Sequence, residues 1–314
     1  MSITLQTSSK KVSYAIGIDL GGTFIKSGIA DSSGKVYKEH KVESYSENSP
    51  QKVISQIEIC IDKLLKGFNK PLMGIGIGSP GIVHNGVVKN PPNFKNWKEE
   101  NLKKHFSKKY RMEVEVDNDA NCAGLAELRF GHGKKINDFI FLTLGTGIGG
   151  AIIIDGKVYK GEKSGAGEFG MASINFEGPP CRGGNPGAVE AYLGRNYFLE
   201  NEKREIEKLG KKIDFDDISK YAAKGNKTAK NLYKKYGFYL GAALTNYFNL
   251  MDVRTCILSG GISNAYKYFI DECNKTIKER ALKTIRNEFK VLKSNMNNDA
   301  GILGAASLIF GLYL

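Results

Sequence analysis

Residues 16–26 of this chain read IGIDLGGTFIK and decide its fold. An apolar run ends at an aspartate, two glycines and a threonine follow, and the apolar pattern resumes, which is typical of a tight turn between two strands. Adjacent glycines can adopt positive φ values and let an anion approach backbone N–H groups. A phosphate-binding turn and an ordinary Gly-Gly hairpin both explain this fragment. In the first interpretation the ligand-facing residues are Asp19, placed for a metal ion, and Gly21, Gly22, Thr23 and Lys26.

The composition is that of a globular protein with two domains. Of its 314 residues, 41% are hydrophobic and 25% are charged, and this length favours two domains around a cleft. The net charge of +13 comes from lysines that are spread along the sequence. Such a charge suits an anionic ligand such as a nucleotide, whereas a nucleic-acid partner would favour clustered basic residues.

The first residues and the cysteines predict a cytoplasmic protein without a membrane partner. Residues 1–13 are polar and lack the apolar core of a signal peptide. The longest uncharged runs, 139–154 and 300–314, contain glycines and are shorter than the ~18 residues that a membrane span needs. The five cysteines show no paired spacing, which favours a reducing compartment.

Strands and helices are predicted to alternate in the first part of the chain. The turn at residues 78–81 follows a strand end, where ligands tend to bind in α/β sheets, and loop 90–93 follows it. Asp119 opens a small-residue helix, where an aspartate is more often an N-cap than a catalytic group. The segments predicted here are strands over Tyr14–Asp19, Ile25–Ala30, Lys35–Val42, Leu72–Ile77 and Glu113–Asp117, and a helix over 51–66.

A second glycine-rich turn repeats the pattern of the first. The apolar strand predicted over Phe139–Leu144 runs into GTGIGG at residues 145–150, and another strand is expected over Ala151–Ile154. A dinucleotide-binding fold requires a helix after the glycines, so this pattern argues against a nicotinamide site. Two turns of one type indicate two related lobes that bind a polyphosphate.

The rest of the sequence is largely helical. Gly260 and Gly261 separate a predicted strand from a helix, and this junction offers backbone N–H groups and room for the nucleoside end of ATP. The segments expected here are helices over about 190–208, 215–223 and 227–250, a strand over Val253–Leu258, and helices over 263–282 and Ala300–Phe310.

Taken in order, these motifs resemble the ROK family of sugar kinases and sugar-responsive repressors. Each motif alone is weak, but the series is specific and covers nearly the whole chain. The residues that carry the resemblance are Asp19-Leu20-Gly21-Gly22-Thr23, Gly78-Ser79-Pro80-Gly81, Asn118-Asp119-Ala120-Asn121, Gly145-Thr146-Gly147-Ile148-Gly149, Ala166-Gly167-Glu168-Phe169-Gly170, Gly184-Asn185-Pro186-Gly187-Ala188-Val189-Glu190 and Leu258-Ser259-Gly260-Gly261.

The resemblance implies an α/β fold of the two-lobed, actin-like ATPase type that hexokinases share, with sugar and ATP in the cleft between the lobes. It places an N-terminal lobe at residues 1–125 and a larger C-terminal lobe at 126–299. The helix at about 300–314 is expected to pack back on the first lobe.

The same resemblance implies a role for each motif. Asp119 would be the general base that accepts the proton of the sugar 6-hydroxyl. Asp19 would lie near Mg²⁺, and Gly260 and Gly261 would border the adenosine. The phosphates of ATP would be cradled by residues of the two turns, Gly21, Gly22, Thr23, Lys26, Gly145, Thr146 and Gly147. The sugar would be contacted by Asn118, Glu168, Glu190, Gly81 and Asn93.

The chain departs from the family at the loop that usually binds a structural zinc. The family has a histidine and three cysteines there, whereas this sequence has Met171, Cys181, Gly183 and Ala188. One thiolate cannot hold an ion that normally takes four side-chain ligands, so we expect no zinc. Met171 also removes a polar sugar contact that is typical of the family.

Two classes of function follow from the resemblance. The first is an ATP- and Mg²⁺-dependent hexose kinase, with glucose as the favoured substrate and N-acetylmannosamine or N-acetylglucosamine as alternatives. The second is a sugar-binding regulator without turnover. A DNA-binding repressor of the family carries an extra domain before the first strand, and the thirteen residues before Tyr14 are too few for it. The resemblance also implies a homo-oligomer, a dimer or a tetramer.

Overall fold

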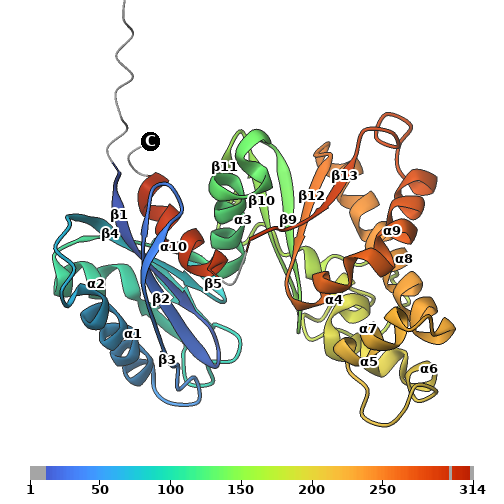
Figure 1. Ribbon diagram of the computed structural model, residues 1–314, viewed down its shortest axis with the longest axis horizontal. Helices are drawn as coiled ribbons and strands as arrows, with labels where there is room; N and C mark the ends of the chain where they lie inside the picture. The colour runs from blue at the N-terminus through green and yellow to red at the C-terminus, as the bar shows by residue number, and fades with distance from the viewer. Residues whose placement is uncertain (1–11, 297–298, 312–314) are drawn as a thin grey trace, which may run out of the picture. The chain divides into compact units, whose positions relative to one another are not determined.

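The computed structural model describes residues 12–296 and 299–311. These residues form two compact units, one within Met1–Phe130 and Asn297–Leu314 and the other within Gly131–Met296 (Figure 1). We call them the first unit and the second unit. Each unit has a five-stranded sheet and a hydrophobic core of its own.

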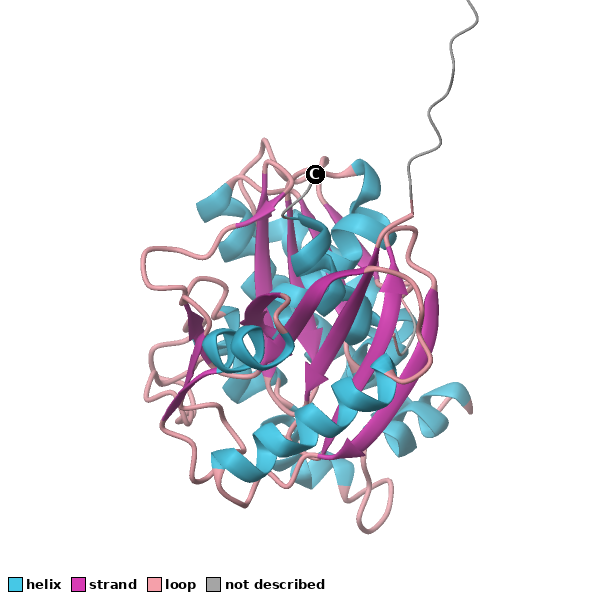
Figure 2. Ribbon diagram, turned by 90° about the vertical axis from the view of Figure 1, so that its left-hand side faces the viewer, coloured by secondary structure: helices cyan, strands magenta, loops and turns pink. Residues whose placement is uncertain are grey.

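The first unit is a mixed sheet with helices on both faces, drawn by secondary structure in Figure 2. Its strand order is β3-β2-β1-β4-β8, in which β1 is antiparallel to β2 and parallel to β4. A small antiparallel sheet, β5-β6-β7, is inserted after β4. The elements are β1 (Tyr14–Leu20), β2 (Phe24–Asp31), β3 (Val36–Glu43), α1 (Pro50–Leu65), β4 (Leu72–Ser79), β5 (Ile82–His84), β6 (Val87–Lys89), β7 (Glu99–Asn101), α2 (Leu102–Tyr110), β8 (Glu113–Asn118), α3 (Asp119–Phe130) and α10 (Ala300–Phe310).

The two faces of this sheet are built from different side chains. Ile16, Ile18 and Leu20 of β1 belong to the core that also contains the buried stripe of α1. Successive strand residues point to opposite faces, so the residues between them face α10. Gly17 of β1 and Gly76 of β4 lie there, and a Cβ atom on either would clash with the backbone of α10. Figure 1 shows the result, with the red C-terminal helix against the blue N-terminal strands.

The second unit repeats this strand arrangement. Its order is β11-β10-β9-β12-β13, with β9 antiparallel to β10 and parallel to β12. The long helix α8 packs against α9 and supplies much of the core. The elements are η1 (His132–Lys135), β9 (Phe139–Leu144), β10 (Ile148–Ile154), β11 (Lys157–Val158), η2 (Phe169–Met171), α4 (Val189–Leu193), α5 (Arg195–Asn201), α6 (Lys203–Ile206), α7 (Phe215–Ala223), α8 (Lys227–Met251), β12 (Thr255–Ser259), η3 (Gly261–Ala265), α9 (Tyr266–Arg280) and β13 (Lys290–Lys293).

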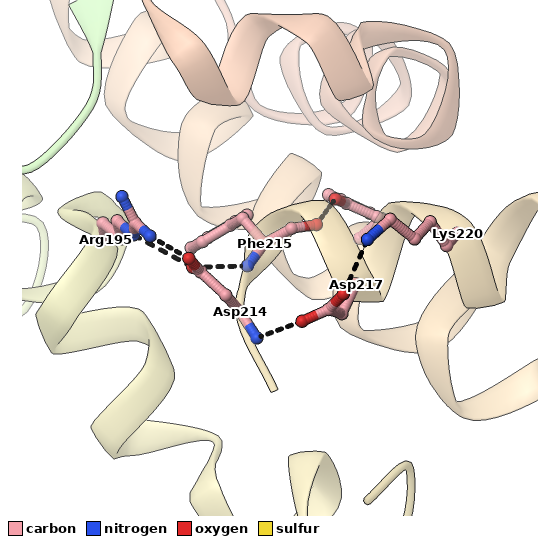
Figure 3. A network of polar contacts seen from close by, with 6 residues as sticks. Arg195, Asp214, Phe215, Asp217 and Lys220 are labelled. Carbon is pink, nitrogen blue, oxygen red and sulfur yellow. Dashed lines mark hydrogen bonds and ion pairs between the residues drawn. The ribbon is translucent and has the colours of Figure 1, made fainter. Parts of the chain in front are cut away.

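The N-terminus of α7 is closed by a network of polar side chains (Figure 3). The Asp214 carboxylate accepts the Phe215 N–H at 2.6 Å and forms an ion pair with Arg195. In return, Asp217 accepts the Asp214 N–H at 3.3 Å and bonds Lys220. This is a capping box, which satisfies the N–H groups that the first turn of a helix leaves unpaired.

Most predicted elements are present, but one helix is wrong. The helix expected over about 190–208 is three short helices, because the chain is extended at Gly194. A Cβ atom on Gly194 would lie 3.1 Å from the carbonyl oxygen of Thr146, so the glycine lets the chain bend beside the second turn. The helix expected over 263–282 also begins differently, since a 3₁₀ turn precedes α9.

Residues 12–296 and 299–311 contain no candidate for a membrane-spanning helix. None of the helices described there combines the length and the apolar character that a crossing requires.

Candidate functional site

The turn between β1 and β2 collects five of the predicted ligand-binding residues. Asp19 near the end of β1 pairs in register with Lys26 of β2. The Gly21 N–H donates to the Phe24 carbonyl at 3.1 Å and so closes the turn. Gly22 lies against Asn93, since a Cβ atom on it would be 3.2 Å from the Asn93 Cβ. The turn thus brings loop 90–93 beside the glycines.

The expectation that this turn needs positive φ values is wrong. Neither Gly21 nor Gly22 is among the positive-φ glycines of the described chain. Glycine is required at position 21 for space, because a Cβ atom there would lie 2.8 Å from the Phe24 carbonyl oxygen. Ser44, which the sequence analysis did not identify, stabilises the turn: its buried hydroxyl donates to the Gly22 carbonyl at 2.7 Å. A lone serine after a strand carries no signal that would have revealed this.

The junction of β8 and α3 holds Asn118 and Asp119. The Asn118 side-chain oxygen accepts the Ala120 N–H at 2.9 Å, and its amide donates to the Gly81 carbonyl at 3.0 Å. Asn118 therefore caps α3 and ties it to the turn after β4. Asp119 also accepts the Ala120 N–H, at 2.8 Å and through one oxygen only. Both side chains therefore bond the first turn of α3.

The two carboxylates of the first unit interact electrostatically. The pKa of Asp19 is raised to about 6, mainly by burial and then by the charge of Asp119, while Lys26 opposes the shift. Loss of hydration also raises the pKa of Asp119 above its usual range. The N-terminal turn of α10 packs on Asp19 as well, since Gly301 leaves no room for a side chain against that carboxylate. Both groups hold a proton more readily than an ordinary aspartate.

The turn between β9 and β10 is built like the first one. The Gly145 N–H donates to the Gly147 carbonyl at 3.1 Å. After Gly147, the Ile148 N–H donates to the Glu190 carboxylate at 2.9 Å. Gly147 packs directly on the same carboxylate, where a side chain would clash. The predicted sugar contact Glu190 and the predicted phosphate turn are therefore in direct contact.

Arg182 is a member of this site that sequence reasoning missed. Its Nε lies 2.8 Å from Glu190 Oε1 and its Nη2 lies 3.4 Å from Oε2. Arg182 lies in a glycine-rich loop without periodicity, and Glu190 lies eight residues later in the first turn of α4, so no sequence pattern predicts the pair.

Glu168, Gly260 and Gly261 complete the predicted set in the second unit. Gly260 adopts φ 86° and packs against the carbonyl of Leu144, at the base of the second turn. Gly261 faces open space. Glu168 is exposed and lies just before η2, in a loop whose Gly167 packs on the backbone of Gly150. Gly260, which is predicted to border the adenosine, thus lies next to the second turn.

The loop at the family's usual zinc position does not fit that ion. Met171 packs with Cys181, Ala188 and Ala191 in a small apolar cluster. Its sulfur fills the place where a side chain on Gly183 would stand. A thioether and a single thiol are not the donor set of a structural zinc. Among the described residues, no group of three or more histidine, cysteine or acidic side chains is placed to hold a metal ion.

The chain is similar to known proteins of one family. A model described as the ROK family matches residues 15–311. The xylose repressor of Bacillus spizizenii is 30% identical over 98% of this chain and 79% of that protein. The glucokinase of Thermotoga maritima is 31% identical over 94% of this chain and 96% of its own length. A solved ROK family glucokinase from Streptomyces griseus, in complex with glucose and AMPPNP, has a TM-score of 0.79 and 29% identity, covering 94% of this chain and 99% of that one.

Proposed function

Because this chain belongs to the ROK family and has its two-lobed, actin-like α/β fold, we propose that it is an ATP-dependent hexose kinase. It transfers the γ-phosphoryl group of ATP to the 6-hydroxyl of a sugar, and glucose is the preferred substrate. Similarity to glucokinases over nearly the full length of both chains supports this proposal. The observation that carries it is the Asp119 carboxylate, which lies at the start of α3, bonds the helix through one oxygen, and has a pKa that loss of hydration raises.

Asp119 acts as the general base. Phosphoryl transfer depends mainly on positioning and on neutralising charge, and the attacking hydroxyl must lose its proton to a nearby group. A carboxylate with a raised pKa accepts that proton more readily than an ordinary one. Asn118 contacts the sugar beside it, and Gly81 and Asn93 line the same part of the first unit.

The glycine turns bind the phosphates. Each turn uses the N–H of its first glycine internally, so the donors offered to a phosphate come from the residues that follow, including Thr23 and Thr146. Lys26 adds a positive charge near the first turn. Glu168 and Glu190 accept hydrogen bonds from sugar hydroxyls, and Gly260 and Gly261 border the adenosine.

Asp19 suits a magnesium ion held through water or phosphate. Its oxygens are hard ligands, and burial together with the charge of Asp119 raises its pKa to about 6. Mg²⁺ bound with ATP neutralises charge on the phosphates. Asp19 contributes by attracting that cation once it has lost its own proton.

ADP release tests the proposal. The purified chain would be assayed with ATP and Mg²⁺ against glucose, mannose, fructose, N-acetylglucosamine and N-acetylmannosamine. A clear preference for glucose is the expected result. A preference for an N-acetylated sugar would keep the mechanism and correct the substrate, whereas no turnover with any sugar would contradict the kinase assignment.

A sugar-binding regulator without turnover is the second candidate. It is favoured by the 30% identity to a xylose repressor, which is about as high as that to the glucokinases. Calorimetric titration with glucose and xylose separates the two candidates. A regulator would bind sugar tightly without releasing ADP, whereas a kinase does both.

A further inference from the structure

The Glu190 carboxylate is buried where the second turn meets α4. Only 3% of its side chain is exposed. Oε2 accepts the Ile148 N–H at 2.9 Å and lies against Gly147. A buried carboxylate is costly unless charged or N–H donors surround it, so its position depends on what else bonds to it.

Arg182 supplies the remaining donors. Its guanidinium spans both carboxylate oxygens, at 2.8 Å from Oε1 and 3.4 Å from Oε2. The arginine side chain is 56% exposed, whereas the carboxylate that it pairs with is buried. A carboxylate can accept about four hydrogen bonds, and the three contacts described leave one acceptor position on Oε1.

Hydrogen bonds and apolar packing hold the loop that carries Arg182. The Arg182 N–H donates to the Tyr197 hydroxyl at 3.0 Å. The Asn185 amide donates to the Met171 carbonyl at 2.9 Å, and the Met171 side chain packs with Cys181. These contacts hold the backbone of Arg182, so its guanidinium is pre-organised over Glu190.

We propose that Arg182 is a positioning residue that sets sugar affinity by fixing the Glu190 carboxylate. With Oε2 committed to Ile148 and both oxygens held by the guanidinium, the open acceptor of Oε1 keeps one direction toward a sugar hydroxyl. This inference rests on the proposed function for the identity of the ligand. It assigns Arg182 no contact with the reacting atoms and no part in proton transfer.

The first test is a kinetic split between sugar binding and chemistry. Arg182→Gln removes the charge and the paired donors, and we expect the KM for the sugar to rise roughly tenfold, since a hydrogen bond to a charged group is lost. The kcat and the KM for ATP stay near their wild-type values. Arg182→Lys keeps the charge and recovers part of the loss. Arg254→Gln, which breaks the pairs of a partly exposed arginine with Asp252 and Glu288 in the same unit, is the control.

A double-mutant cycle shows whether Arg182 acts through Glu190. In the Glu190→Gln background, Arg182→Gln is expected to change sugar affinity little further, because the partner is already altered. Equal losses in both backgrounds would overturn the inference, as would a rise in the KM for ATP alone. Thermal melting of each variant checks that the fold is retained.

Calorimetric titration with glucose in the absence of ATP separates this inference from the proposed function. If the wild type binds glucose without releasing ADP, the kinase assignment fails while the comparison of binding by wild type and Arg182→Gln still tests Arg182. If Arg182→Gln binds glucose as the wild type does, the inference fails whatever the activity.

Discussion

In the first unit the glycine turn lies beside two aspartates whose pKa values are raised, whereas in the second unit the corresponding turn lies beside a glutamate that an arginine and a backbone N–H hold in place. The strand order around the two turns is the same. Backbone architecture therefore does not decide what each turn can do. The side chains next to it do: under the proposed function they give the first unit a general base and a carboxylate that attracts a cation, and the second unit a fixed carboxylate for the sugar.

The substitution expected to change activity most is at Asp119, and it tests whether the first unit supplies the base. Asp119→Asn removes the proton acceptor but keeps the shape of the side chain, so kcat should fall by about 10²- to 10⁴-fold. The KM for the sugar should change little. Steady-state ADP release measures both, with Asp155→Asn, an exposed turn aspartate, as the control. Wild-type kcat in Asp119→Asn would show that the first unit does not supply the base.

The second prediction concerns Asp19 and the dependence of the rate on Mg²⁺ concentration and pH. Asp19→Asn should raise the Mg²⁺ concentration for half-maximal rate by about 10- to 100-fold, the range typical of outer-shell partners of a metal. In the wild type this requirement should rise as pH falls through about 6, because Asp19 gains a proton and loses its charge. In Asp19→Asn the requirement should depend less on pH in that range, since only other groups such as Asp119 still titrate. An unchanged pH dependence in the variant would assign the effect to another group.

In the first unit, Gly17 and Gly76 let α10 pack closely on the sheet. Gly76→Ala places a methyl group against the Ala305 carbonyl, so we expect the free energy of unfolding to fall by about 1–3 kcal/mol. Urea unfolding followed by the fluorescence of Trp97, the only tryptophan, reports on this unit. Gly165→Ala is the control, because a Cβ atom there meets nothing within 4 Å. Equal stability of the two variants would refute close packing as the reason for this glycine.

The smallest effect is expected at the capping box of α7. Asp214→Ala removes the helix cap and the partner of Arg195, so stability should fall by about 1 kcal/mol while turnover is unchanged. Asp216→Ala on the same helix is the matched control, since Asp216 is exposed. A loss of sugar affinity in Asp214→Ala would mean that the Arg195–Asp214 pair also affects sugar binding. The effect of Arg182 on sugar affinity would then not be specific to its pair with Glu190.

Local signals predicted most of the fold. The helices α7 and α10 have the predicted bounds, because turn residues and apolar content mark them within a few positions. The helix predicted over about 190–208 is wrong because the chain is extended at Gly194, where the Arg195 N–H donates to the carbonyl of Gly145, a residue distant in sequence.

The site shows the same limit. The glycine turns and the position of Asp119 at a helix start are readable from short motifs. The choice of Asn118 as the cap depends on side-chain directions that adjacent polar residues do not reveal. The Arg182–Glu190 pair depends on the path of an irregular loop, and the pKa of Asp19 depends on burial and on Asp119 far along the chain.

The most direct test compares Asp119→Asn and Glu190→Gln in two assays, ADP release at saturating sugar and calorimetric sugar binding without ATP. The account predicts that Asp119→Asn binds sugar like the wild type but releases almost no ADP. It predicts that Glu190→Gln binds sugar weakly but keeps most of its kcat once sugar is saturating. If both variants lose binding and turnover in the same proportion, the division of labour between the two units is contradicted.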